Sequence, residues 1–312
     1  MHVKTFESRR CGGELRAAGW ASWLAVVWLC TGTLGCGPAL GEGGLEEPLA
    51  KTGAEQKLEF PNGLNLNGLN LNGLNLNGLN LNGLSLNGLA TQDFADWFRD
   101  DTVGRNETMK YVVACAVPAG ERRTYTDASN TTYQWVGLLG LAANWSAGNK
   151  ATDDELQVVS ACMAAHANKF GVHVNISLRG WDGAGQPIPF TLQEDNNYTL
   201  REGCFFGNLF DGQTGVFSGN DGLTLGAQQS SPRVCALAGP SGASQCQPMT
   251  FVGSCAASCT RDSATGEYTS CRHGTTTFKP LTTRMKSTDL YTCGNGLCEA
   301  AESSATCAAD CH

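Results

Sequence analysis

The chain has 312 residues, a formal net charge of −8 at pH 7 and only 16% charged residues, so it has room for one or two domains with attached segments. Its acidic balance repels phosphate backbones and argues against nucleic-acid binding. Its 15 cysteines include no C-x-x-C pair. In a reducing cytosol so many thiols would need metals or catalysis to explain them, so the count favours an oxidising compartment, where disulfides persist.

The first 36 residues have the features of an export signal. Basic side chains between Lys4 and Arg16 precede an apolar run at 20–29, which suits a signal peptide and is too short to span a bilayer comfortably. Residues 33–36, Thr-Leu-Gly-Cys, resemble a bacterial lipobox, in which Cys36 becomes the lipidated first residue. The resemblance implies a lipid anchor in a membrane. An ordinary secretory signal peptide cut nearby is the alternative.

The cysteine count agrees with processing at Cys36. Cleavage there removes four basic and two acidic side chains, which takes the formal net charge from −8 to −10, and it also removes Cys11 and Cys30. With Cys36 lipidated, an even number of cysteines remains, as a complete set of disulfides requires. The predicted disulfide cysteines are Cys115, Cys162, Cys204, Cys235, Cys246, Cys255, Cys259, Cys271, Cys293, Cys298, Cys307 and Cys311.

A flexible linker at 37–61, rich in Gly, Glu and Pro, is expected to precede a repeat segment at 62–89. The repeat unit is NGLNL, a strand-like Leu-Asn-Leu joined by an Asn-Gly turn. It resembles the pentapeptide-repeat family, which forms a square β-helix. The segment makes little more than one coil, and Leu64 and its equivalents are bulky for inward positions. Three hypotheses stay open: a semi-ordered tether, strands that pair with the adjacent domain, and a self-associating segment.

Two helices and a hairpin are expected next. Thr91 suits the N-cap of a short helix whose apolar face lies within 94–98. A second helix is expected to start at Asn106, with an alternating strand at 111–117 as the alternative. Residues 123–137 predict a β-hairpin.

The clearest helix is predicted at 152–170. Thr152 and Glu155 have the spacing of a capping box, in which each side chain accepts a hydrogen bond from the other residue's backbone. Cys162 lies in the middle of this helix. We predict that it pairs with Cys115, because both lie on apolar elements with no other cysteine near in sequence.

An alternating pattern at 172–179 predicts a half-buried strand. Its polar face comprises His173, Asn175, Ser177 and Arg179. This face could line a ligand site, and a solvated surface is the alternative. A turn at 182–185 is predicted to lead into a strand at 188–192, and two short strands are predicted around 204–206 and 215–217.

From Cys235 to Cys271 the chain has five cysteines and little apolar periodicity, so loops held by disulfides are expected. Cys204 could complete a set of six cysteines, for which fifteen pairings exist. The expected division is an α+β domain at 91–235, a disulfide-rich loop region at 236–292 and a small terminal module at 293–312.

The terminal module reads CGNGLCEAAE and then CAADC. It resembles a short repeat found at the ends of bacterial extracellular proteins. The resemblance implies two interleaved disulfides, Cys293–Cys307 and Cys298–Cys311, and calcium as a possible ligand. The oxygen donors that suit such a hard cation are Asn295, Glu302 and Asp310. Solvated turn residues are the alternative, and no other cofactor is expected.

No catalytic motif stands out. The segment around Ser146 is the nearest match to the G-x-S-x-G nucleophile elbow, but it lacks the first Gly. Cys162 and His166 are one helical turn apart, as a thiolate–imidazole pair would be, although a disulfide cysteine beside a packed His is the simpler interpretation. A hydrolase site would need His166 or His173 near Ser146 or an acidic residue. Four aromatic residues could stack on sugars or pack in the core: Trp135, Trp145, Trp181 and Tyr133.

Several longer segments resemble a set of uncharacterised myxobacterial predicted lipoproteins. They are the NGLNL repeat, CAVPAG at 115–120, WVGLLGLAANW at 135–145, SACMAAHANKFGVHVNISLRG at 160–180 and EGCFFGNLF at 202–210. This resemblance implies no activity. We expect an α+β disulfide-bonded fold in a protein of the bacterial cell envelope, outer membrane-anchored or secreted. The expected role is binding or structural, toward an unidentified envelope or extracellular ligand and with self-association through the repeat. An extracellular or envelope hydrolase is the alternative.

Overall fold

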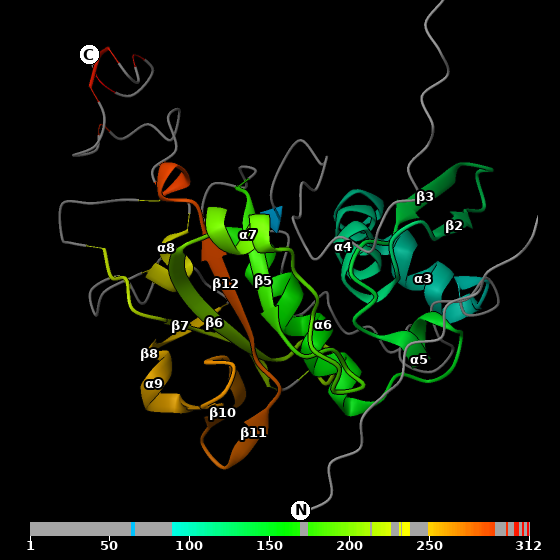
Figure 1. The fold of residues 1–312 in the computed structure, drawn as a ribbon. Helices are drawn as coiled ribbons and strands as arrows, with labels where there is room; N and C mark the ends of the chain where they lie inside the picture. The colour runs from blue at the N-terminus through cyan, green and yellow to red at the C-terminus, as the bar shows by residue number, and fades with distance from the viewer. Residues whose placement is uncertain are drawn as a thin grey trace, which may run out of the picture. The chain divides into compact units, whose positions relative to one another are not determined.

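A five-stranded mixed sheet with the strand order β5-β12-β6-β7-β8 forms the centre of the fold (Figure 1). Its strands are β5 (Ile176–Gly180), β12 (Leu281–Met285), β6 (Leu200–Asn208), β7 (Gly215–Asn220) and β8 (Thr250–Ser254). The pairs β5–β12, β12–β6 and β6–β7 are antiparallel, whereas β8 runs parallel to β7. The sheet therefore combines strands from both sides of residue 235, where the α+β domain was expected to end.

The computed structural model describes residues 64–65, 89–168, 174–212, 214–225, 231, 233–237, 249–290, 298, 303–305, 308 and 311. All of them belong to one compact unit, Glu47–His312. Helices combine with antiparallel and mixed sheets, so the α+β class is confirmed. Among the described residues, no helix has the length and hydrophobicity needed to cross a membrane.

One face of the sheet packs on α6 (Asp153–His166), and α4 (Thr102–Ala116) packs against α6 on the side away from the sheet (Figure 1). The inward side chains of β5, such as Leu178, belong to the main hydrophobic core together with both helices. Full burial of one such side chain contributes roughly 1.5–3 kcal/mol. The Cys115–Cys162 disulfide joins the two helices inside this core, as predicted.

The predicted capping box at the start of α6 is confirmed, since Thr152 and Glu155 each accept the other's backbone N–H. The helix was expected to reach residue 170 but ends at His166. Ala167–Asn168 forms β4 instead, which pairs in parallel with β1 (Leu64–Asn65) in the first repeat unit. Backbone pairing with this segment replaces the next helical turn. The repeat residues 66–88 lie outside the described part of the chain.

The region before α6 contains α3 (Gln92–Asp100) and a hairpin of β2 (Arg122–Thr126) and β3 (Thr132–Val136), as expected. Thr91 caps α3 through its side chain. The start of α4 was predicted too late: Asp101 caps the helix by accepting from the Gly104 N–H, so it begins at Thr102. The alternative of a strand at 111–117 is wrong. A short helix, α5 (Ala143–Ser146), follows the hairpin.

Part of the other face of the sheet is covered by a three-stranded sheet of order β11-β10-β9, namely β9 (Cys259–Arg261), β10 (Tyr268–His273) and β11 (Thr276–Phe278). A short helix, α9 (Cys255–Ser258), precedes it. A second small core, which includes Phe206, Phe217 and Phe278, lies between the two sheets. The disulfide bonding predicted for this region is confirmed by Cys204–Cys255 and Cys259–Cys271. Strands replace the predicted loops at 259–278, where β9 and β11 are too short and too exposed to show apolar periodicity.

The turn at 182–185 is confirmed, but the strand at 188–192 is not formed. Thr191 accepts the Glu194 N–H, which caps a helix, α7 (Leu192–Asn197). The short strands predicted around 204–206 and 215–217 are confirmed and extend further, as β6 and β7. Two shorter elements are α8 (Val234–Leu237) and a 3-10 turn, η3 (Ser287–Asp289).

Four disulfides join described cysteines: Cys115–Cys162, Cys204–Cys255, Cys259–Cys271 and Cys298–Cys311. The last one was implied by the resemblance of the terminal module. Cys235 is disulfide-bonded as well. The other predicted positions lie outside the described residues: Cys36, Cys246, Cys293, Cys307, the calcium donors Asn295, Glu302 and Asp310, and His173.

Candidate ligand-binding face

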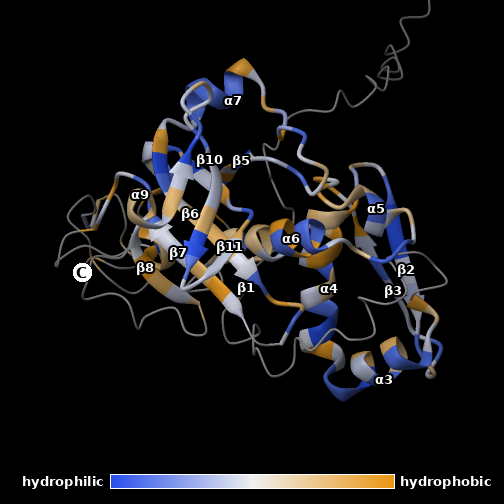
Figure 2. Cartoon of the chain, turned by 90° about the horizontal axis from the view of Figure 1, so that it is seen from below, coloured by the Kyte–Doolittle hydropathy of each residue, from blue (hydrophilic) through white to orange (hydrophobic). Residues whose placement is uncertain are grey.

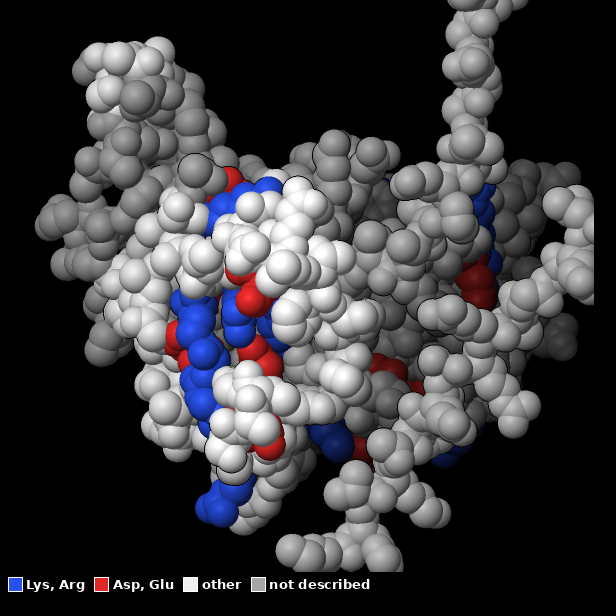
Figure 3. Space-filling model, in the orientation of Figure 1, with Lys and Arg blue, Asp and Glu red and all other residues white. Residues whose placement is uncertain are grey.

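Charged side chains gather on the face of the sheet that turns away from α6, in the area between α7 and the β9–β11 sheet. We call them the charged cluster: Arg179, Asp195, Arg201, Asp221, Arg261, Glu267 and Arg284. Figure 3 shows basic and acidic side chains side by side on the molecular surface below α7. Strand alternation places them there, because Arg179 and Arg284 lie opposite the side chains that pack on α6.

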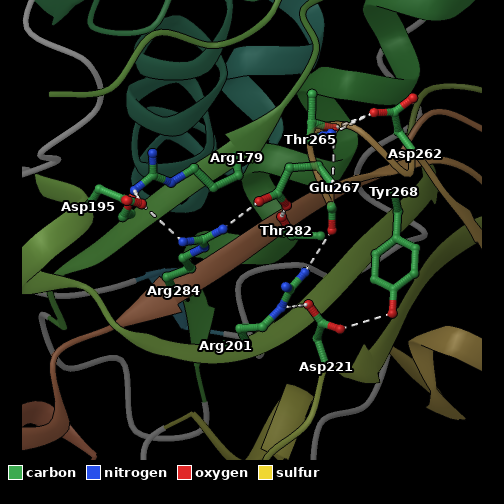
Figure 4. Close-up of polar contacts among 12 residues, drawn as sticks. Arg179, Asp195, Arg201, Asp221, Asp262, Thr265, Glu267, Tyr268, Thr282 and Arg284 are labelled. Carbon is green, nitrogen blue, oxygen red and sulfur yellow. Dashed lines mark hydrogen bonds and ion pairs between the residues drawn. The ribbon is translucent and has the colours of Figure 1, made fainter. Parts of the chain in front are cut away.

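Arg284 connects two parts of the cluster (Figure 4). Its Nη1 lies 3.0 Å from Asp195 Oδ1 on α7, and its Nη2 lies 2.7 Å from Glu267 Oε1. The Thr282 hydroxyl donates to the other Glu267 oxygen at 2.6 Å. Both oxygens of the buried Glu267 carboxylate therefore have donors, so this part of the cluster is satisfied internally.

Asp221, at the end of β7, organises the second part of the cluster. Its carboxylate accepts from Arg201 Nε and from the Tyr268 hydroxyl, both at 2.9 Å, and from Arg261. Burial, followed by the contact with Asp221, raises the pKa of the Tyr268 hydroxyl above its ordinary value. Tyr268 therefore stays protonated and acts as a hydrogen-bond donor at neutral pH.

Arg179 is the exception in the cluster, because its side chain is only 1% exposed and poorly paired. Nη2 lies 3.4 Å from Asp195 Oδ1, and neither Nε nor Nη1 has an acceptor among the described residues. The guanidinium stacks on Phe190, whose ring centroid is 3.5 Å away. Burial lowers the pKa of Arg179 from its ordinary value. Buried donors without acceptors are uncommon in proteins and costly.

A surface hollow of about 200 Å³ lies beside the cluster. It is lined by Trp181, Gly185, Thr269, Lys279 and Pro280. Trp181 comes two residues after Arg179, and Pro280 comes directly before β12, so the hollow lies at the end of β5 and the start of β12. An aromatic wall beside a hydroxyl and an ammonium group can bind a ligand that has both apolar and polar surfaces.

The four aromatic residues considered as sugar-binding candidates differ in whether they lie in the core or at the surface hollow. Trp135 and Trp145 are fully buried, and Tyr133 packs on Phe98 with ring centroids 4.8 Å apart. These three belong to the core or pack against it. Trp181 alone among the four lines the surface hollow.

The groups considered for catalysis are engaged elsewhere. The Ser146 hydroxyl donates to the Ala143 carbonyl. His166 is buried, with Nδ1 2.8 Å from the Cys162 carbonyl oxygen and its ring against Tyr111. Because Cys162 is in a disulfide, it supplies no thiolate to His166. The described contacts therefore assemble no nucleophile–base pair from these residues.

Among the described residues, two groups of sulfur and imidazole atoms lie close enough together to suggest metal ligation. They are Cys115, Cys162 and His166, and Cys204, Cys259 and Cys271. Every cysteine in both groups is in a disulfide, and the metal ligand is a thiolate. Neither group fits a metal ion.

The three comparisons with known proteins give no assignment: no protein-family model, no curated protein and no solved structure matches the chain. The candidate site is therefore inferred from the geometry of its residues. The sequence singled out Arg179 and Trp181 but missed Asp195, Asp221, Glu267 and Arg284. Arg284 and Asp195 are 89 residues apart, and no local pattern signals that they meet.

Proposed function

We propose that this chain is an exported binding protein of a bacterial cell envelope, anchored by a lipid on Cys36, and that it binds saccharide polymers at the hollow beside Trp181. Export is supported by four disulfides among the described cysteines, one of them wholly buried between α4 and α6. Such disulfides form and persist in an oxidising compartment. Residues 62–89 serve as the joint between the anchored end and this domain, and the pairing of β1 with β4 supports that role.

The hollow carries the binding proposal. At about 200 Å³, it is smaller than the roughly 300–1,000 Å³ that encloses a drug-sized ligand. An open hollow of this size suits one ring of an extended polymer. The Trp181 ring offers a flat face for the apolar side of a sugar. The Thr269 hydroxyl donates to the Thr260 carbonyl, so its oxygen can accept from a sugar hydroxyl, while the Lys279 ammonium, which pairs with Asp154 at 3.4 Å, has further N–H groups to donate.

The binding test is cosedimentation of the purified mature chain with insoluble envelope polymers, namely peptidoglycan sacculi and extracellular polysaccharide. Trp181→Ala is expected to weaken binding roughly ten-fold, equivalent to about 1.4 kcal/mol. Val103→Ala is the matched control, since Val103 is 84% exposed on α4 and lines no part of the hollow. Equal binding by the wild-type chain and Trp181→Ala would overturn the site.

The anchor is tested separately by mass spectrometry of the mature protein. A diacylglycerol-modified Cys36 at the N-terminus is expected, and Cys36→Ser should release the protein from the membrane fraction. An unmodified N-terminus at another residue would disprove the lipid anchor and leave the binding site untouched.

A further inference from the structure

Arg179 is the one member of the charged cluster with buried donors left over. Its Nε and Nη1 carry three N–H groups that meet no acceptor among the described residues, although the side chain is 1% exposed. The carboxylates around Arg284 and Arg201 are already satisfied by several donors each. Glu194 and Asp195 balance the charge of Arg179, but its Nε and Nη1 have no acceptor among the described residues. Buried donors without an acceptor are costly, so these donors can take an acceptor from outside the chain.

The Arg179 side chain lies beneath a partly exposed aromatic ring. The Phe190 ring, which stacks on the guanidinium, is 50% exposed, and Leu192, at the start of α7, is 77% exposed. Figure 2 shows strongly hydrophobic and strongly hydrophilic colours together on α7. Asp195 reaches Arg179 at only 3.4 Å while it holds Arg284 at 3.0 Å. Movement of Phe190 would open Arg179 without breaking the Asp195–Arg284 pair.

We propose that Arg179 is the anchor for the carboxylate of an acidic sugar, whose ring lies against Trp181. Trp181 follows the last residue of β5, two positions after Arg179, so their Cα atoms are at most roughly 7 Å apart. That separation matches a sugar ring together with the carboxylate that it carries. This inference rests on the proposed binding role and names the ligand class within it.

The charges favour a carboxylate over a phosphate. The cluster holds four arginines and three carboxylates, and the buried Glu194, which accepts from Ser177 on β5, supplies a fourth. These charges balance, so a carboxylate that accepts from the free Arg179 donors adds one negative charge to the cluster. A second charge, as on a phosphate, would lie near Asp195 and Glu267, where like charges repel.

The test uses the full mature chain with sodium glucuronate and sodium galacturonate, each compared with its methyl ester at matched ionic strength. The acids are expected to raise the thermal unfolding midpoint of the wild-type chain more than the esters do. Arg179→Met should remove this difference, whereas Arg272→Met, at an exposed arginine on β10, should keep it. Equal shifts by acid and ester in the wild-type chain would overturn the proposal.

Stability without a ligand gives a control for this comparison. Arg179→Met removes the cation beside the buried Glu194, so it should lower the urea midpoint of the ligand-free chain. The role of Arg179 as an anchor is therefore judged by the difference between acid and ester within each variant. If the esters and acids shift the midpoint equally and Trp181→Ala abolishes both shifts, the saccharide site stands and only the carboxylate preference fails.

Discussion

Glu155 of α6 accepts the backbone N–H of Asn144 at 2.7 Å, and this contact ties the start of α5 to the start of α6. The same carboxylate also accepts from the N–H groups of Trp145 and Thr152. Glu155 is buried, so its removal would leave three backbone donors without their acceptor. The capping-box carboxylate therefore serves two helices.

Glu155→Ala is expected to lower the free energy of unfolding by about 3 kcal/mol, because hydrogen bonds to a charged acceptor contribute roughly 1.5–3 kcal/mol each and are partly replaced by water. Urea unfolding of the mature chain measures the change. Asp153→Ala, in the same first turn but exposed, should cost less than about 1 kcal/mol. Equal losses for the two variants would contradict the role of Glu155 beyond α6.

The disulfide between Cys115 and Cys162 closes a loop with a sequence separation of 47. Replacing both cysteines by Ala should cost about 4 kcal/mol through the greater entropy of the unfolded chain. The matched double variant at Cys259 and Cys271, with a separation of 12, should cost about 3 kcal/mol. Denaturant unfolding under non-reducing conditions compares them, and a larger loss for the short loop would argue against the entropic account.

Local signals in the sequence were reliable where they depend on neighbouring residues. The capping box at Thr152 and the hairpin at 123–137 are set within a few residues, and both are present. The pairing of Cys115 with Cys162 was also predicted, because each lies on an apolar helix face and had few alternatives. Hydrophobic alternation also predicted a strand here and placed Arg179 opposite Leu178. The strand begins only at Ile176, and the prediction of a half-buried strand is wrong, because Ser177 and Arg179 on its polar face are buried as well.

Structural features that depend on residues far apart in the sequence could not be predicted. The end of α6 at His166 is set by the pairing of β4 with β1, about a hundred residues upstream. β12 joins β5 and β6 in the main sheet although its own sequence, Leu-Thr-Thr-Arg-Met, gives only weak alternation. The charged cluster has the same origin, since its ion pairs join strands and a helix that only the sheet topology brings together.

Arg233 and Glu202 form an ion pair in the interior, 2.7 Å apart and with side chains 2% and 0% exposed. Arg233→Met should destabilise the chain by about 3–5 kcal/mol, because it leaves the Glu202 carboxylate buried without its cation. Adding Glu202→Gln to this variant should recover most of the loss, since no buried charge then remains. A double-mutant cycle by urea unfolding measures both values. A double variant no more stable than Arg233→Met would contradict the electrostatic explanation.

The Asp127 carboxylate in the β2–β3 turn makes the stability of the hairpin depend on pH. Its carboxylate accepts from the Ser129 hydroxyl at 2.7 Å, from the Thr131 N–H at 2.9 Å and from the Tyr133 hydroxyl at 3.2 Å. These contacts, led by the Ser129 hydroxyl, hold the pKa of Asp127 below its ordinary value. The folded state therefore binds the proton less tightly than the unfolded state does.

The stabilising effect of Asp127 is then fully present above the unfolded pKa of about 4 and is lost as the pH falls through the lower folded value. NMR titration of the Asp127 carboxyl carbon should show the lowered pKa, and the Thr131 amide should exchange faster as the carboxylate is protonated. Asp127→Asn keeps an acceptor oxygen but removes the charge, so its Thr131 exchange should lose this pH dependence. A carboxyl that titrates at or above the ordinary value would show that the turn contacts do not hold in solution.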